Sequence, residues 1–282
     1  MKTLVLNINP HKPEKAKVQI AAEIIKKGGL VAFPTETVYG LGADALNPKA
    51  VLALFEAKKR PLDNPPIIHV ENADDVHKLA KHVPPEAELL MKHFWPGPLT
   101  LILERSHAVP DVTVAGLDTV AVRMPKHEVA LALIRESGVP IAAPSANLAG
   151  KPSSTSAEHV LDDLNGRIDA VLDGGSTCVG VESTVLDLSV CLPMVLRPGG
   201  ITFEALREIL GEVKLHPFVA AEKEIVAGET RSPGMKHKHY APKAKLILVE
   251  GSISAVVEKI GKMVKDYRQE GCRVGVLATD ET

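Results

Sequence analysis

The chain has 282 residues, with 33 Lys and Arg against 35 Asp and Glu, so its formal net charge at pH 7 is −2. This balance excludes the polycation expected of a protein that binds nucleic acid by charge alone, and an aromatic content of 3% provides few rings for stacking on bases. The composition also excludes collagen, a disordered chain and a disulfide scaffold, and a chain of this length can bury about 73% of its unfolded surface.

The three cysteines, Cys178, Cys191 and Cys272, are widely spaced and form no C-x-x-C motif. An odd, sparse set is typical of a reducing compartment and argues against a structural zinc site. The N-terminal residues lack the apolar region of a signal peptide, and no apolar run approaches the roughly 18 residues of a membrane-spanning helix. We therefore expect a cytoplasmic protein with no membrane partner.

Strands and helices alternate along the first 210 residues. Apolar spacing predicts a helix over 14–27 that ends at Gly28-Gly29, followed by a short apolar strand at 30–33 and a loop, PTETVYGLG. A helix is expected to begin at Pro48 and to run to about Lys58. Further strands are expected at 66–70, 99–103, 119–124, 140–143, 170–172, 184–188 and 194–196, and further helices at 74–82, 85–93, 128–136, 157–164 and 203–210. Short apolar strands mixed with helices indicate an α/β sheet covered on at least one side.

The composition changes near residue 215, which suggests a domain 1–215, a linker 216–244 and a C-terminal domain 245–282. Between Arg231 and Lys245 there are five Lys or Arg, two His and no acid. From Lys245 a strand, a helix near 253–268 and a final strand predict one βαβ unit. Since one such unit cannot bury both faces of a parallel pair, we expect this domain to be incomplete.

Familiar nucleotide and metal motifs fit poorly. No G-x-x-x-x-G-K-[ST] is present, and the G-x-G-x-x-A that begins at Gly40 lies six residues after its strand instead of directly behind it. His237 and His239 flank a lysine with no third ligand nearby, so a solvated basic loop is the better interpretation than a metal site. Cys178 is a weaker candidate for a nucleophile than for a spectator thiol.

Four polar stretches lie at the ends of predicted strands and helices, at positions where residues packed in a core would be apolar. They are Pro34–Gly40, Lys58–Pro61, Pro144–Asn147, and Glu182–Thr184 with Arg197–Gly200. Each alone has an ordinary structural explanation, such as a turn or a basic helix end. Together, at the ends of strands, they are expected to converge on one cleft whose hydroxyls, amides and cations suit a polyphosphate.

These motifs resemble the YrdC-like family of threonylcarbamoyl-AMP synthases in its longer two-domain form. The pair Lys58-x-Arg60 with Ser145-x-Asn147 matches the family's characteristic tetrad, beside PTETVYGLG, VRMP, ESTV and LRPGG. The resemblance covers about residues 10–210 and extends to the string SPGM…HYAP between residues 232 and 242. It implies a YrdC-like twisted mixed sheet with flanking helices, followed by a linker and a partial Rossmann-like βαβ unit.

The resemblance further implies a nucleotidyltransferase that makes threonylcarbamoyl-AMP from L-threonine, bicarbonate or CO₂, and ATP, and releases pyrophosphate. The product would serve threonylcarbamoyladenosine modification of tRNA through a separate transferase complex. Mg²⁺ would be held by ATP phosphates and water, without protein ligands. The alternatives are an RNA-binding module of the same fold, a hydrogenase-maturation carbamoyltransferase, and a non-enzymatic scaffold.

By the same resemblance, Lys58 and Arg60 are the expected catalytic residues, which would grip the ATP phosphates. Residues 231–242 are expected to fold back as a lid that excludes water from the adenylate. The remaining nucleotide contacts are expected from Thr119, Ser145, Asn147, Ser153, Arg197, Ser232 and Tyr240. The threonine site is expected from Thr35, Tyr39, His69, Arg123 and Ser183, with Arg123 as the partner of the carboxylate.

Overall fold

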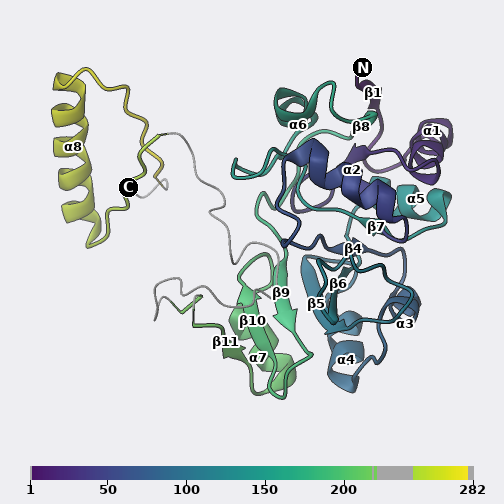
Figure 1. Ribbon diagram of the computed structural model, residues 1–282. Coiled ribbons are helices and arrows are strands. Elements are labelled where there is room, and N and C mark those ends of the chain that lie inside the picture. The colour runs from purple at the N-terminus through teal and green to yellow at the C-terminus, as the bar shows by residue number, and fades with distance from the viewer. Residues whose placement is uncertain (1, 218, 221–243, 279–282) are drawn as a thin grey trace. The chain divides into compact units, whose positions relative to one another are not determined.

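The computed structural model describes residues 2–217, 219–220 and 244–278 (Figure 1). The chain forms two compact units, Met1–Ala241 and Pro242–Thr282. None of the helices in the described ranges is long and apolar enough to cross a membrane.

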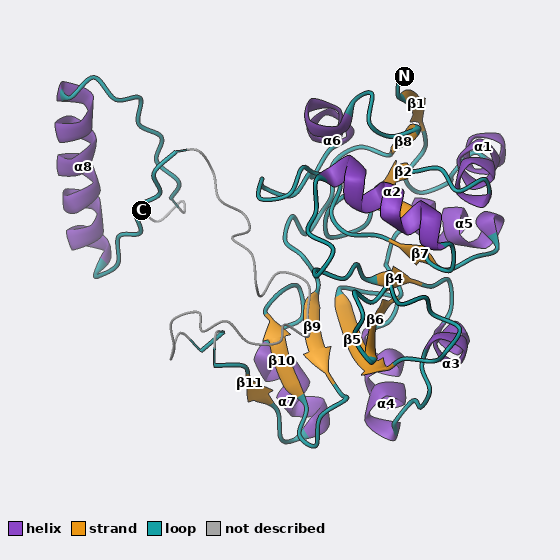
Figure 2. Cartoon of the chain, in the orientation of Figure 1, coloured by secondary structure: helices purple, strands orange, loops and turns teal. Residues whose placement is uncertain are grey.

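The first unit is built on one mixed sheet of eleven strands in the order β1-β8-β2-β3-β7-β4-β6-β5-β9-β10-β11. Figure 2 shows these strands with helices packed beside them. The strands are β1 (Leu4–Asn7), β2 (Val31–Phe33), β3 (Gly40–Asp44), β4 (Ile68–His69), β5 (Leu99–Glu104), β6 (Thr119–Arg123), β7 (Ile141–Ala142), β8 (Ala170–Asp173), β9 (Thr184–Asp187), β10 (Met194–Arg197) and β11 (Lys214–Leu215).

The helices largely follow the predicted ranges. They are α1 (Lys15–Lys26), α2 (Pro48–Lys58), η1 (Ala73–Asp75), α3 (Val76–Leu79), α4 (Pro85–Phe94), α5 (Glu128–Ser137), α6 (Ala157–Leu164) and α7 (Phe203–Leu210). The predicted helix at 74–82 is instead a 3₁₀ turn and one helical turn, and β1, β3 and β11 were not expected.

Helices cover both faces of the half-sheet around β2. Val31 and Phe33 pack with α1 and α5, whereas Ala32, between them in sequence, packs in a separate cluster with α2 and α6. This division follows from the two-residue period of a strand, which sends successive side chains to opposite faces.

The other half-sheet is covered differently on its two faces. One face, which includes Leu101 and Val122, packs with α3, α4 and α7 in the largest apolar cluster. The opposite face has a small cluster of Ile67, Ile102, Ala121, Val185 and Leu196, which contains no helix residue. Alternation along the strands places polar side chains on this second face, so it is the face on which a site can form. They are Thr100, Arg123, His69 and Ser183.

The second unit contains α8 (Ile253–Gln269), as predicted. The expected βαβ unit is wrong in its strands, since residues 244–250 and 273–278 form none. A single strand pair without further strands or a covering layer has too little buried surface to be stable. The expected linker 216–244 lies mostly outside the described residues, and its boundaries stay a prediction.

Candidate active site

An open hollow lies between two groups of loops in the first unit. The first group joins the end of β2 to the start of β3 and includes the loop after β7, which meets β3 through a bridge between Gly40 and Ser145. The second group contains the ends of β6 and β10 and the start of β9. Eight of the predicted site residues line this hollow: Thr35, Arg60, His69, Arg123, Ser145, Asn147, Ser183 and Arg197.

The turn after β2 is held by its own hydroxyl. Thr35 Oγ1 donates to the Val38 carbonyl oxygen at 2.6 Å and lies 2.9 Å from Thr37 Oγ1. Tyr39 is fully buried and its hydroxyl donates to the Gly175 carbonyl, so in this structure the ring lies behind the wall of the hollow. Its expected contact with threonine stays a prediction.

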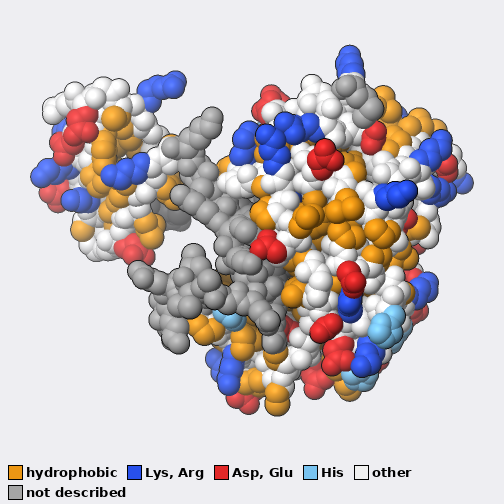
Figure 3. All heavy atoms as spheres, in the orientation of Figure 1, with side chains coloured by type: hydrophobic (Ala, Val, Ile, Leu, Met, Phe, Trp, Pro, Cys, Tyr) orange, Lys and Arg blue, Asp and Glu red, His pale blue; other side chains and the backbone are white. Residues whose placement is uncertain are grey.

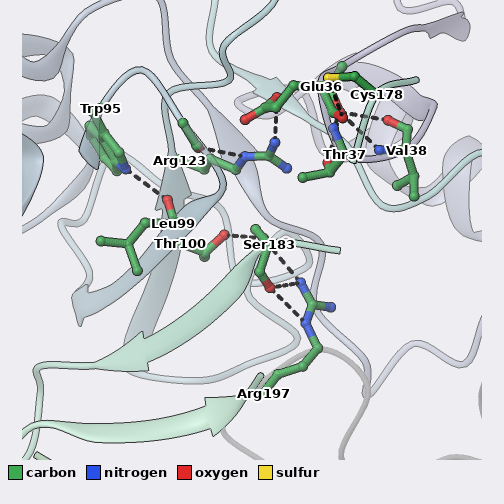
Figure 4. Close-up of polar contacts among 12 residues, drawn as sticks. Glu36, Thr37, Val38, Trp95, Leu99, Thr100, Arg123, Cys178, Ser183 and Arg197 are labelled. Carbon is green, nitrogen blue, oxygen red and sulfur yellow. Dashed lines mark hydrogen bonds and ion pairs between the residues drawn. The ribbon is translucent and has the colours of Figure 1, made fainter. Parts of the chain in front are cut away.

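Arg123 ends β6 and is only 3% exposed. Its Nε donates to the Gly97 carbonyl at 3.2 Å, and its Nη2 lies 2.7 Å from Glu36 Oε2, as Figure 4 shows. Burial lowers the pKa of the Arg123 guanidinium, which the Glu36 carboxylate opposes and the nearby Arg197 reinforces. The guanidinium therefore stays in a fixed orientation beside a second cation.

Arg197 and Ser183 form a second fixed pair. Arg197 donates through Nε and Nη2 to the Ser183 carbonyl at 3.1 and 2.9 Å, and through Nη2 to Ser183 Oγ at 3.1 Å. Ser183 Oγ also lies 2.8 Å from Thr100 Oγ1 (Figure 4). Two guanidinium groups thus face one hollow, which is an arrangement suited to an anion with several oxygens.

His69 provides a neutral group between these cations and the first loop. Burial, reinforced by the charge of Arg123, lowers the pKa of His69 to about 3. Its Nδ1 lies 3.3 Å from the Ile67 carbonyl, which can only accept, so Nδ1 donates and Nε2 is left as an acceptor. The imidazole can accept a hydrogen bond from an amine or hydroxyl, but it is too weakly basic near pH 7 to remove the proton of that group.

Lys58, a predicted catalytic residue, is buried behind the 145–147 loop and does not line the hollow. Asn47 caps α2 by accepting from Lys49 N, and the helix ends at Lys58, whose side chain is 1% exposed. The ammonium donates to the main-chain oxygens of Ser145 and Asn147 and does not line the hollow. Burial, then the charge of Arg60, holds the pKa of Lys58 well below its usual value. In this structure Lys58 holds the 145–147 loop, and a contact with phosphate stays a prediction.

Arg60 lines the hollow but also organises the loop that follows it. Its Nε donates to the Asn64 carbonyl at 2.8 Å, and Nη2 donates to Asn64 Oδ1 and to the Pro65 carbonyl. Asn147 is likewise committed, because Nδ2 donates to the carbonyls of Leu148 and Lys151. Since both partners only accept, the amide orientation is fixed and Oδ1 is turned elsewhere, buried and without a partner among the described residues.

Ser153 and Thr119, two predicted nucleotide contacts, do not line the hollow. Ser153 Oγ donates to the Glu182 carboxylate, which does line it. Thr119 begins β6 on the same face as Arg123, but the rise of the strand separates them by about 13 Å. Their contacts stay predictions. Ser232 and Tyr240, with the lid of residues 231–242, lie outside the described residues.

Sequence reasoning gave no role to Glu36, Thr37, Lys151 or Glu182. Thr37, Lys151 and Glu182 line the hollow, and Glu36 lies behind Arg123. The available signal for Glu36 was an acid directly after a buried apolar strand, flanked by threonines. Lys151 belongs to no recognisable motif, and it reaches the hollow beside Asn147, whose Nδ2 donates to its main-chain oxygen.

The described residues offer no cluster of three His, Cys, Asp or Glu side chains that could hold a metal ion. His237 and His239, the metal alternative from the sequence, lie outside them. Cys178 is exposed, and its thiol donates to the Glu36 main-chain oxygen at 3.5 Å.

The fold and the hollow define an α/β protein with a hollow lined by several cationic side chains. The sequence matches two family profiles: Sua5/YciO/YrdC, described as telomere recombination, over residues 23–199, and the threonylcarbamoyl-AMP synthase C-terminal domain over residues 201–282. The chain therefore belongs to the Sua5/YciO/YrdC family, as the resemblance of its motifs indicated.

Three relatives describe this membership more closely. A threonylcarbamoyl-AMP synthase of Pyrococcus abyssi is 52% identical over 277 residues, which cover 98% of this chain and 80% of that relative. One of Bacillus subtilis is 52% identical over 262 residues, which cover 93% of this chain and 73% of the relative. The crystal structure of P. abyssi Sua5 complexed with L-threonine matches with a TM-score of 0.93 and 50% identity, over 99% of this chain and 82% of that one.

Proposed function

We propose that the hollow binds L-threonine and ATP, and that the chain is a threonylcarbamoyl-AMP synthase. The observation that carries the proposal is the pair of fixed guanidinium groups, Arg123 and Arg197, on one polar face of the sheet. Relatives that carry this activity in their names share 52% of their aligned residues with the chain. The reaction joins L-threonine, bicarbonate or CO₂, and ATP into threonylcarbamoyl-AMP and releases pyrophosphate.

Threonine is placed on the Arg123 side of the hollow. Arg123 binds the carboxylate through the nitrogen that the protein does not use, and Ser183 and Thr35 provide hydroxyls for the remaining polar groups. His69 accepts a hydrogen bond from the amine or the side-chain hydroxyl through Nε2. Polar partners for the hydroxyl distinguish threonine from an apolar amino acid far better than packing around its methyl group does.

The ATP phosphates are placed toward Arg60, Arg197 and the Ser145–Asn147 loop. Among the described residues, this side contains donors and cations but only one lining carboxylate, Glu182. Lys58 contributes by fixing the loop through two of its three N–H donors, and it meets a phosphate only if its buried ammonium becomes accessible from the hollow. Thr119, on the same face of β6, is the proposed contact for the distal part of the nucleotide.

Catalysis in this site is positioning and electrostatic stabilisation. The neutral amine of threonine attacks CO₂ with loss of one proton to solvent, or bicarbonate with loss of water, to give a carbamate. A carbamate oxygen then displaces pyrophosphate from the α-phosphorus. Negative charge grows on the leaving pyrophosphate and on the equatorial oxygens, where cations held in advance lower the barrier without reorganising.

Mg²⁺ accompanies ATP in this proposal. The described residues contain no acidic cage for it, while a triphosphate and water supply the hard oxygen ligands that this ion prefers. Bound there, Mg²⁺ neutralises phosphate charge. The side chains of this chain orient the phosphates around it.

The product is proposed to pass to a separate transferase complex that modifies an adenosine of tRNA. The three free cysteines are consistent with a cytosolic setting. An RNA-binding module without catalysis is less well supported. On the face shown in Figure 3, Lys and Arg side chains are interspersed with acidic and apolar ones and form no broad basic surface.

The decisive experiment incubates the chain with ATP, Mg²⁺, threonine and bicarbonate, with detection of threonylcarbamoyl-AMP by mass spectrometry and of pyrophosphate in parallel. We expect both products, and neither without threonine. Serine in place of threonine measures the contribution of the methyl group. RNA binding with no adenylate under these conditions would support the RNA-binding alternative instead.

A further inference from the structure

The buried carboxylate of Glu36 has no role in the site as assigned above, yet it contacts the residue placed on the threonine carboxylate. Glu36 is 5% exposed and does not line the hollow. Its Oε2 lies 2.7 Å from Arg123 Nη2 as an ion pair, and both of its carboxylate oxygens are buried without a hydrogen bond among the described residues. An acid in this position must act on a ligand through Arg123 if it acts at all.

The contacts of Arg123 leave one nitrogen for a ligand. Nε is taken by the Gly97 carbonyl and Nη2 by Glu36, and in the part of the chain that the structure describes no protein acceptor lies on Nη1. Since a guanidinium is planar, contacts on two of its nitrogens fix both its position and the direction of the third. Figure 4 shows the head of Arg123 between Glu36 and Thr37, on the side of the turn that follows β2.

The loop that carries Glu36 is itself fixed. The main-chain oxygen of Glu36 accepts from Val179 N at 2.9 Å, and that of Thr37 accepts from Gly180 N at 3.0 Å. Together with the Thr35 hydroxyl bonds within the turn, these contacts hold the Cα of Glu36 in place. The Glu36 carboxylate is therefore attached to a backbone with a fixed position.

We propose that Glu36 is a positioning residue, which orients Arg123 so that Nη1 faces the amino-acid carboxylate. The proposal rests on the assignment of threonine to this side of the hollow. Glu36 contributes through the place and length of its side chain, because its charge is already neutralised by Arg123 and is hidden from the hollow. Misplacing a binding group by about 1 Å can cost up to about 100-fold in a preorganised site.

Three substitutions separate the contribution of the length of the Glu36 side chain from that of its charge. Glu36→Gln keeps the length and an oxygen acceptor for Nη2 but removes the charge. Glu36→Asp keeps the charge but withdraws the carboxylate by about 1.5 Å, one C–C bond. Glu36→Ala removes both. We expect the Kd of threonine, measured by calorimetry without ATP, to rise less than about threefold in Glu36→Gln and about 10- to 100-fold in Glu36→Asp and Glu36→Ala. The Kd of ATP should change less than about twofold in all three.

A double-mutant cycle tests whether the effect passes through Arg123. In an Arg123→Met background, Glu36→Ala should cause no further loss of threonine affinity, since its target is gone. Glu71→Ala serves as the matched control, because Glu71 pairs with Arg135 on the surface of the same unit, outside the hollow. Far-ultraviolet circular dichroism confirms that each variant is folded. If Glu36→Ala does not fold, the comparison of Glu36→Gln with Glu36→Asp still tests the proposal.

Three results would overturn the proposal. Glu36→Asp could bind threonine like the wild type while Glu36→Gln loses it, which would make charge the contribution. All variants could bind normally, or the loss could persist without Arg123, so that Glu36 acts elsewhere. Failure of the wild-type chain to bind threonine at all is a separate result, which would refute the proposed function instead.

Discussion

Lys58→Met tests what the buried lysine does, because it keeps the aliphatic stem and removes the ammonium. The structure gives that ammonium two main-chain acceptors, the oxygens of Ser145 and Asn147. Hydrogen bonds to a charged group are worth about 1.5–3 kcal/mol each, but the unfavourable burial of the charge offsets part of this. We expect the free energy of unfolding to fall by about 3 kcal/mol, or a Tm lowered by roughly 6–12 °C in a unit of this size.

The same substitution should weaken ATP binding and turnover, because the Ser145–Asn147 loop loses its support. On the order of 10²–10³ in turnover is expected, by analogy with the removal of one positioned donor. Thermal denaturation followed by circular dichroism and a pyrophosphate-release assay measure the two effects. Lys49→Met, at an exposed position on the same helix, is the control. Lost turnover with an unchanged Tm would refute this reasoning and favour direct contact between Lys58 and phosphate.

The pH dependence of stability gives an independent check. The pKa of Lys58 is lowered in the folded state, so below 10.5 the unfolded chain binds more protons than the folded one does. Stability contributed by this group therefore rises with pH and is complete above 10.5. The difference in unfolding free energy between wild type and Lys58→Met should grow as the pH is raised toward 10.5. A constant difference would show that the lysine remains charged in the fold.

Three further outcomes are expected. His69, with a pKa of about 3, should show no NMR titration between pH 5 and 8, and because the unfolded imidazole titrates near 6.5, its contribution to stability should be lost as the pH falls from 6.5 toward 3. Lys151→Ala should raise the KM for ATP several-fold and leave that for threonine unchanged, because Lys151 lines the hollow and its ammonium, which pairs with Asp163, is a cation that a phosphate oxygen can share. Gly42→Ala should lower the unfolding free energy by about 1–3 kcal/mol, measured by urea denaturation, since the added Cβ would lie 2.8 Å from Phe33 and Ile141 side-chain atoms.

Elements with local signals were predicted well from the sequence. The helix α2 begins at Pro48 and ends at Lys58 as expected, because Asn47 and Pro48 provide the N-terminal cap and first turn. The strand β3 was missed, since its glycines suggested a loop. Gly42 is required there by Phe33 and Ile141, which pack where a Cβ would be, and that reason lies in tertiary packing.

Strands whose partners lie far away in the sequence were also not predicted correctly. The strand β1 is held by β8 in parallel register, Leu4 opposite Ala170. Its apolar run of three residues is short and largely exposed, so the sequence alone did not identify it as a strand. The two strands expected beside α8 show the reverse case: apolar runs near Leu246 and Val276 did not become strands, because a strand needs a partner as well as a propensity.

The residues that line the site could be predicted from the sequence, but the hydrogen bonds that orient them could not. Motif order identified the loops that meet, and eight of the expected residues line one hollow. The orientation of their cations is set by main-chain oxygens at Gly97, Ser145 and Ser183, which carry no side-chain signal. A motif such as Lys58-x-Arg60 therefore indicates that a lysine and an arginine are needed, and only the fold decides which faces the ligand. In this chain the arginines line the hollow, while the lysine holds the 145–147 loop from behind.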